Sequence, residues 1–314
     1  MPDLQKNQID AEALQTFATV AQLRSFSAAA ELLHKTTSAI SYRIKTLEDS
    51  LGTPLFQRTT RSVTLTPSGE VLLERASLIF EWLHTLPEEL KQVRDGIEPH
   101  FTLVVNNLLY DADTIAALLE HLVAQFPHTV FEVRRGVYMG VWDELIHNGG
   151  QMAVGVPGFH TIDDEFVTEP LGVINWVFVV PPLHPLASAP APLGNELLRR
   201  FPAVNVRDTS HRLTKRTAWK LPGQREFLVP DLAAKVACHR QGLAVGFLPG
   251  PVARELIHSK QLVERDVEVG RLPSPLALAW RRKDAGKITA HLRELCVSRD
   301  ALVLPLFAPM DQSD

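Results

Sequence analysis

Between residues 9 and 51, hydrophobic positions recur at helical spacing in three successive segments, 9–21, 27–33 and 37–51. Ser27 is the expected N-cap of the second segment, and Gly52 follows the third where a helix end favours positive φ. A short turn joins the second and third segments, which predicts a helix-turn-helix. On this pattern alone, an ordinary amphipathic helix pair fits equally well.

The third segment has two chemically different faces. Its apolar face carries Ile40, Ile44, Leu47 and Leu51. The opposite face is polar and can hydrogen-bond base edges and phosphates. That face and its preceding turn consist of Thr36, Thr37, Ser38, Ser41, Tyr42 and Lys45, with Arg43 at the edge.

Residues 54–66 predict two short strands around a Thr-Thr-Arg-Ser tip, because Val63 and Leu65 alternate with two threonines. Such a hairpin beside a reading helix is a wing, and Arg58, Thr60 and Arg61 are its expected DNA contacts. The whole chain has a net charge of −4, yet residues 34–66 hold five cations against two carboxylates. This local excess favours a nucleic-acid partner.

Several motifs resemble the winged helix of LysR-type transcriptional regulators: residues 25–30 (SFSAAA), 38–41 (SAIS), 47–48 (LE), 55–56 (LF) and 65–66 (LT). The resemblance implies an N-terminal winged helix-turn-helix (1–66), a long linker and dimerisation helix (67–96) and a two-lobed, periplasmic-binding-protein-like α/β effector domain (97–314). Lobe I would hold about 101–172 and 276–314, and lobe II about 173–275. The implied partners are double-stranded promoter DNA, a small-molecule effector and further copies of the chain, as homodimer or homotetramer. RNA polymerase is left open as a partner.

The linker helix should begin at Pro67, with Thr66 as its N-cap. Its apolar positions are spaced alternately by four and three residues, which is typical of a seam between two helices. One-sided packing on the winged domain is the alternative. Pro87 predicts a kink or break near Leu86, where Thr85 would cap a second helix, and residues 95–99 predict a hinge. The seam residues are Leu72, Ala76, Ile79, Leu83, Leu86, Leu90 and Val93.

Beyond residue 99, short apolar runs alternate with helical patterns, which predicts mainly parallel sheets covered on both faces. Strands are expected at 101–105, 129–134, 152–156, 173–180, 203–206, 225–229, 243–248 and 276–280. Helices are expected at 113–126, 139–147, 232–241 and 288–297. The family usually has Leu-Asp where Gln151 and Met152 stand, so a contact from that aspartate is absent.

Polar residues just after predicted strands are the candidate effector ligands, since open α/β sheets bind ligands at those ends. Asn106 and Asn107 follow one strand, and Asp208, Thr209 and Ser210 follow another and should open a helix. Turn or capping roles compete evenly with ligand binding. Tyr138 and Trp142 share a helix face, where they either stack on a flat ligand or pack in the core, the better-supported role. Arg134 and Arg135 are expected as surface cations or ion-pair partners.

Four stretches (106–110, 138–143, 213–224 and 273–280) resemble the enterobacterial LysR-type activators of allantoin-utilisation genes. This implies an activator of purine or allantoin (ureide) nitrogen use. A LysR-type regulator of an unrelated pathway remains the alternative.

Other classes of function are disfavoured by missing signals. The chain lacks a Gly-x-Ser-x-Gly elbow, a His-Glu-x-x-His pair and a phosphate loop, which argues against a ureide-metabolising enzyme. No apolar run is long enough for a bilayer and no signal pattern is seen, which argues against a membrane association or an exported solute-binding protein. Cys238 and Cys296 fit no metal or redox spacing. We therefore expect a cytoplasmic protein without cofactor or metal.

Overall fold

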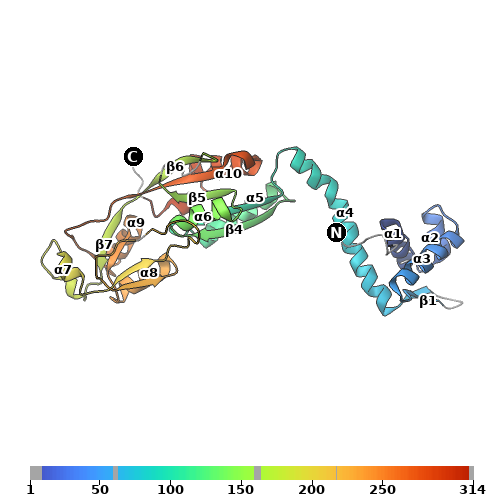
Figure 1. Ribbon diagram of the computed structural model, residues 1–314, viewed down its shortest axis with the longest axis horizontal. Helices are drawn as coiled ribbons and strands as arrows, with labels where there is room; N and C mark the ends of the chain where they lie inside the picture. Colours follow the sequence, from blue (N-terminus) through green and yellow to red (C-terminus); the bar gives the residue numbers. More distant parts are fainter. Residues whose placement is uncertain (1–8, 59–62, 159–163, 217, 311–314) are drawn as a thin grey trace. The chain divides into compact units, whose positions relative to one another are not determined.

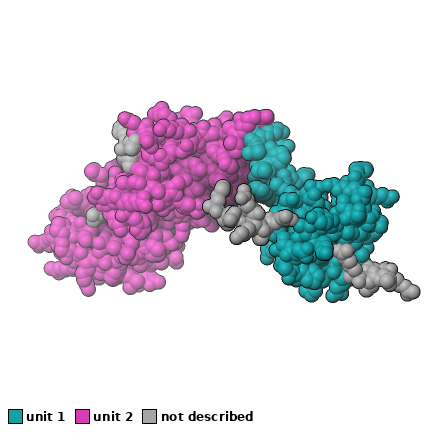
Figure 2. Space-filling model, turned by 45° about the vertical axis from the view of Figure 1, so that its right-hand side comes forward, with its two compact units in different colours: residues 1–91 teal, residues 92–314 magenta. Residues whose placement is uncertain are grey.

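The structure is a computed structural model that describes residues 9–58, 63–158, 164–216 and 218–310 (Figure 1). It divides into two compact units, 1–91 and 92–314 (Figure 2). Among the described helices, none is both long and apolar enough to cross a membrane. Each unit has its own hydrophobic core.

The first unit contains the predicted three helices and hairpin. These are α1 (Ala11–Leu23), α2 (Phe26–Leu32), α3 (Thr37–Leu51), β1 (Phe56–Arg58) and β2 (Val63–Leu65). The prediction of Ser27 as N-cap of α2 is wrong, because the Ser25 hydroxyl accepts the Ala28 N–H at 3.2 Å and starts the helix earlier. At the end of α3, Gly52 adopts the expected left-handed conformation with φ 67°.

The apolar face of α3 is buried, and this orients its polar face outward. Ile40, Ile44 and Leu47 lie in one cluster with Phe17 and Phe56. The Glu48 carboxylate accepts the backbone N–H groups that begin the hairpin, from residues 55 and 56, at 2.7 and 3.2 Å. Core packing and these hydrogen bonds hold the hairpin beside α3.

Helix α4 (Pro67–Arg94) begins as predicted, with the Thr66 hydroxyl accepting the Gly69 N–H at 3.0 Å. The expectation of a break near Leu86 is wrong, because the helix continues through Pro87. Thr85 does not cap a second helix; its hydroxyl donates to the Trp82 carbonyl one turn back, at 3.0 Å. Proline removes one helical hydrogen bond, which intact flanking turns tolerate.

The apolar seam of α4 changes character along its length. Ala76 is fully buried and Leu72 packs against the core of the first unit, as one-sided packing predicts. Farther along, several large apolar side chains are exposed: Ile79, Leu83, Leu90 and Val93. The seam is therefore partly an intramolecular contact and partly uncovered apolar surface.

The second unit contains a five-stranded sheet in the order β4-β3-β5-β12-β6. Its strands are β3 (His100–Asn106), β4 (Val130–Gly136), β5 (Met152–Pro157), β6 (Phe166–Ile174) and β12 (Ser274–Arg281). β3 is parallel to β4 and β5, whereas β12 is antiparallel to both β5 and β6. The prediction of mainly parallel sheets is thus wrong, because the chain leaves this sheet along β6 and returns along β12.

Three helices pack with this sheet: α5 (Ala112–Gln125), α6 (Met139–His147) and α10 (Lys287–Ser298). The predicted hinge at 95–99 is anchored to α10 through buried Glu98. Its carboxylate accepts hydrogen bonds from the backbone N–H groups of Gly286, Ile288 and Thr289 and from the Thr289 hydroxyl, at 2.9–3.1 Å. A carboxylate at a helix N-terminus satisfies N–H groups that the helix itself leaves unpaired.

The rest of the second unit forms smaller sheets: β10 (Gly246–Pro249), β7 (Trp176–Val180) and β11 (Val263–Glu264) are antiparallel, and β8 (Ala203–Val206) is parallel to β9 (Glu226–Val229). Its helices are α7 (Asn195–Leu198), α8 (Leu232–Arg240) and α9 (Gly250–His258). The single strand predicted at 173–180 is two strands, divided at Asn175. The helix expected after Ser210 is absent, and described residues 207–216 form an irregular loop.

Candidate nucleic-acid interface and ligand cavity

The outward face of α3 presents hydrogen-bonding groups to solvent. Thr37, Ser38 and Lys45 are exposed, and Tyr42 is 74% exposed, which is high for an aromatic side chain. Ser41 is half-buried. The Thr36 hydroxyl is engaged as N-cap, because it accepts the N–H of residue 39 at 3.2 Å. This face can therefore reach base edges and phosphates without rearranging the core.

Of the three arginines predicted to contact DNA, Arg43 and Arg58 lie within the described residues. The Arg43 guanidinium pairs with Glu12 at 3.0 Å and with Asp10 at 3.6 Å, both at the start of α1. Lys35 also pairs with Glu12, and this contact lowers the pKa of that carboxyl. The backbone of Arg58 lies in β1. The predicted contacts Thr60 and Arg61 lie outside the described residues.

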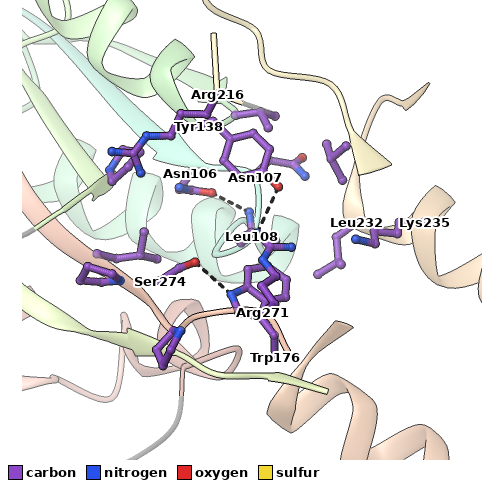
Figure 3. A pocket seen from close by; sticks show the side chains of 16 residues that line it. Asn106, Asn107, Leu108, Tyr138, Trp176, Arg216, Leu232, Lys235, Arg271 and Ser274 are labelled. Atoms are coloured by element: carbon purple, nitrogen blue, oxygen red, sulfur yellow. Dashed lines mark hydrogen bonds between the residues drawn. The ribbon is translucent and has the colours of Figure 1, made fainter. Parts of the chain in front are cut away.

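A cavity of about 220 Å³ lies within the second unit (Figure 3). Its wall includes the loop after β3, the turn before α6, the start of β7, helix α8 and the segment that enters β12. Cavities for drug-sized ligands are typically larger, at about 300–1,000 Å³, so this one suits a small metabolite. Its polar lining residues are Asn106, Asn107, Tyr138, Arg216, Lys235, Arg271 and Ser274.

The two asparagines have different roles in the cavity wall. The Asn106 amide donates to the Gly155 carbonyl at 2.7 Å and accepts the Leu108 N–H at 3.0 Å, which matches the turn role that the sequence left open. The buried Asn107 side-chain nitrogen has no hydrogen-bond partner in the described part of the chain. Of the two asparagines, Asn107 is therefore the one with a free donor to offer a ligand.

Tyr138 lines the cavity in an unusual backbone conformation, with φ 50° and ψ −122°. The Gly140 N–H donates to the Val137 carbonyl at 2.9 Å and closes the turn around Tyr138. A non-glycine residue held in a sparsely populated region costs about 1–3 kcal/mol. The phenol oxygen accepts from an Arg271 nitrogen at 3.4 Å, and Figure 3 shows both side chains at the cavity. Trp142, by contrast, is fully buried against Phe166, as core packing predicts.

Asp208, Thr209 and Ser210 do not line this cavity, so it gives no support to their expected effector role. The Asp208 carboxylate accepts backbone N–H groups from residues 139, 140, 210 and 216 at 2.8–3.3 Å. It thereby caps α6, whose own N-cap residue offers no side-chain hydrogen bond. The Thr209 hydroxyl accepts the Val137 N–H at 2.9 Å, and the Ser210 hydroxyl bonds to the backbone of residue 213. These hydrogen bonds match the capping role that the sequence left open, and they serve a helix of the other lobe.

Two cations at the cavity, the buried Lys235 and the half-buried Arg271, were missed by sequence reasoning. Lys235 on α8 is only 3% exposed, and burial together with the nearby Arg271 charge lowers its pKa to about 7. The Arg271 guanidinium carbon lies 3.4 Å from the Trp176 ring centroid, and the Lys235 nitrogen lies 6.0 Å from it. In sequence, a single lysine in an amphipathic helix and an arginine in a loop resemble surface residues, so no local signal marks this cluster.

Arg134 and Arg135 lie outside the cavity lining. Arg134 pairs with Glu132 at 2.6 Å and with Glu144 at 3.2 Å, as an ion-pair role predicts. The guanidinium of Arg135 stacks over the Tyr110 ring at 4.8 Å. Met152, at the position of the family's aspartate, is fully buried in the core.

Two family models match the chain. Residues 11–70 match "Bacterial regulatory helix-turn-helix protein, lysR family", and residues 95–301 match "LysR substrate binding domain". The chain is 47% identical over 290 residues to the HTH-type transcriptional activator AllS of Salmonella typhimurium, covering 92% of this chain and 94% of that protein. It is 49% identical over 255 residues to AllS of Klebsiella pneumoniae, covering 81% and 94%.

Similarity to another curated regulator and to a solved structure is lower. The HTH-type transcriptional regulator PunR of Escherichia coli K12 is 29% identical over 281 residues, covering 90% of each chain. Among solved structures, a mutant OxyR of Corynebacterium glutamicum superposes with a TM-score of 0.59 at 17% identity, covering 97% of this chain and 96% of that one. At that identity, the likeness supports the fold alone.

Proposed function

Because this chain belongs to the LysR family of bacterial helix-turn-helix regulators, we propose that it activates genes for the use of purine-derived ureides such as allantoin. It is a DNA-binding transcriptional regulator and not an enzyme. The observation that carries the proposal is the 47% identity to the activator AllS, which extends over 92% of the chain. An identity confined to the helix-turn-helix would have supported DNA binding but no particular pathway.

We propose a separate role for each of the predicted domains. The winged helix (1–66) reads promoter DNA through the exposed face of α3, with Ser38, Tyr42 and Lys45 at its centre. The linker helix (67–96) pairs with a second copy through its exposed apolar positions from Ile79 onward, because an uncovered apolar stripe on a long helix favours association. Such dimers, or tetramers built from them, act in the cytoplasm, where promoter DNA lies.

The effector domain (97–314) responds to a small molecule in the 220 Å³ cavity. Residues of two lobes line this cavity, so a ligand that contacts both favours one lobe arrangement over another. Asn107 and Tyr138 are its proposed contacts from the first lobe. Asn107 is proposed because its buried side-chain nitrogen has no hydrogen-bond partner among the described residues, and Tyr138 because its backbone is strained.

Nuclease footprinting with the purified chain on promoters of ureide-utilisation genes tests the proposal. We expect a protected region upstream of those genes. Lys45→Ala should weaken binding to all sequences and lower the salt slope by about one phosphate contact, whereas the exposed Lys283→Ala in the second unit should leave it unchanged. Protection found only at promoters of an unrelated pathway would favour the alternative, a LysR-type regulator of different metabolism.

A further inference from the structure

The cavity in the second unit carries three cations and no acid. Arg216, Lys235 and Arg271 line it, and no Asp or Glu is among its lining residues. Within the described residues, neither Lys235 nor Arg271 forms an ion pair with a carboxylate, although the side-chain nitrogens of other residues form many such pairs. A cluster of like charges in a small, partly enclosed space is unfavourable, and either the loss of a proton or a bound anion relieves it.

The unsatisfied groups of the wall are all hydrogen-bond donors. One terminal nitrogen of Arg271 and the side-chain nitrogen of Asn107 are both buried without a partner in the described part of the chain. The Lys235 ammonium offers up to three more N–H groups. Two hydroxyl oxygens of the wall already accept hydrogen bonds: the Tyr138 oxygen accepts from Arg271, and the Ser274 hydroxyl accepts the Trp176 indole N–H at 2.9 Å. These unpaired donors and the cations favour a ligand that supplies acceptors and negative charge.

The geometry also indicates where the charge of the ligand lies. The Arg271 guanidinium carbon lies over the Trp176 ring, 3.4 Å from its centroid, and this cation–π contact helps to hold the guanidinium at the cavity wall. Lys235 lies near the same ring, and the Arg271 charge contributes to its lowered pKa, so the two side chains interact electrostatically. A planar anion with two oxygens suits this pair, because a carboxylate accepts from a guanidinium and an ammonium at once.

We propose that this cavity binds an anionic effector, a small metabolite whose carboxylate lies between Lys235 and Arg271 and whose urea or amide oxygen accepts from Asn107. This inference rests on the proposed function, since it names the charge and class of the molecule that the effector domain senses. Within the chemistry of ureides, it selects open-chain ureido acids over neutral ring compounds. The neutral ring lacks the charge that would compensate for the buried Lys235 and the half-buried Arg271.

Isothermal titration of the full-length protein with matched pairs of probes tests this. Allantoate is an open-chain ureido acid and allantoin is its neutral cyclic counterpart; oxamate and oxamide form a second pair, and inorganic phosphate is an anion without a carboxylate. We expect each carboxylate to bind at least 30-fold more tightly than its neutral partner and than phosphate. Equal affinity for acid and neutral partner, equal affinity for phosphate, or no binding by either carboxylate would overturn the assignment.

Substitutions locate the binding. Lys235→Met should weaken carboxylate binding at least 30-fold, Lys235→Arg should retain part of it, and the surface control Lys283→Met should bind like the parent. Carboxylate binding that Lys235→Met leaves unchanged would place the anion elsewhere. If that variant does not fold, the parent protein still gives an answer through pH: the affinity should fall about tenfold per pH unit above 7, as Lys235 loses its proton.

The pH readout depends on the groups around Lys235. These are His239 on the same helix and Arg216, Arg271 and Tyr138 at the cavity. His239 stays neutral across the range, because burial lowers its pKa to about 3. A flat affinity between pH 7 and 9 would therefore exclude Lys235 as the anion's partner. Nuclease footprinting on ureide promoters is independent of these binding measurements. The assignment to ureide metabolism can therefore be refuted while Lys235-dependent anion binding is confirmed, and anion binding can be refuted while the assignment to ureide metabolism is confirmed.

Discussion

Replacing Lys235 with methionine should stabilise the ligand-free protein at low pH and do little at high pH. The side chain is almost fully buried, and its pKa of about 7 lies well below the ordinary 10.5. The folded protein therefore releases a proton near pH 7 that the unfolded chain keeps until about pH 10.5. Between these values the unfolded state binds more protons, so the free energy of unfolding rises with pH.

The magnitude follows from the two pKa values. Each pH unit between them corresponds to about 1.4 kcal/mol, so the buried charge destabilises the folded state by about 5 kcal/mol below pH 7. Methionine has a similar length and no charge, and it fills irregular space well. We expect Lys235→Met to exceed the parent by several kcal/mol at pH 6 and to approach it at pH 10. Between pH 7.5 and 9.5 the gap should shrink by about 2.7 kcal/mol.

Urea denaturation followed by tryptophan emission measures this, because four of the five tryptophans lie in the second unit: Trp142, Trp176, Trp219 and Trp280. The control Lys283→Met replaces an exposed lysine and should stay within about 0.5 kcal/mol of the parent at every pH. Parallel stability curves for Lys235→Met and the parent would refute the reasoning. So would a variant less stable than the parent at pH 6, because the ammonium would then be favourably solvated or paired.

Two further predictions concern the linker helix and its anchor. The Ile79 side chain is 42% exposed, so Ile79→Glu should keep the fold but give monomers that bind the operator weakly. The control Ser77→Glu, beside the seam, should remain associated. If sedimentation equilibrium shows that the Ile79→Glu variant is still a dimer, the seam does not pair chains. Glu98→Gln replaces an oxygen that accepts an N–H of α10 with an NH₂ group, which cannot accept it. The free energy of unfolding, measured by urea denaturation, should fall by about 2–4 kcal/mol. A loss of less than about 0.5 kcal/mol would show that water replaces this contact.

Much of the first unit could be predicted because its determinants are local. Helical spacing of apolar residues, the N-cap at Thr66, a glycine at position 52 and strand alternation at 63–65 each act within a few residues. The helix bounds differ from prediction by small shifts, as for α2, where two serines two residues apart compete to be the N-cap. The outward direction of Tyr42 and Lys45 follows from the burial of the opposite face.

The assignment of site residues in the second unit was only partly predictable, because side chains there have alternative partners. Asn107 and Tyr138 do line the cavity. The sequence identified Asp208 as a polar residue after a strand and left ligand and cap as equal choices. Only the tertiary fold brings the start of α6 within reach of the Asp208 carboxylate. The unpaired N–H groups of that helix N-terminus then donate hydrogen bonds to it.

By itself, the sequence determined the winged helix, the long linker helix and the alternation of strands and helices, because propensity, capping and hydrophobic period operate over short distances. Tertiary structure decided the antiparallel pairing of β6 with β12 and the meeting of Lys235 with Arg271, residues 36 positions apart in the chain. Pairings of this kind depend on how the chain returns to a distant strand. The charge of the cavity exists only in the folded chain, because Lys235 and Arg271 approach the same ring, that of Trp176, only through tertiary packing.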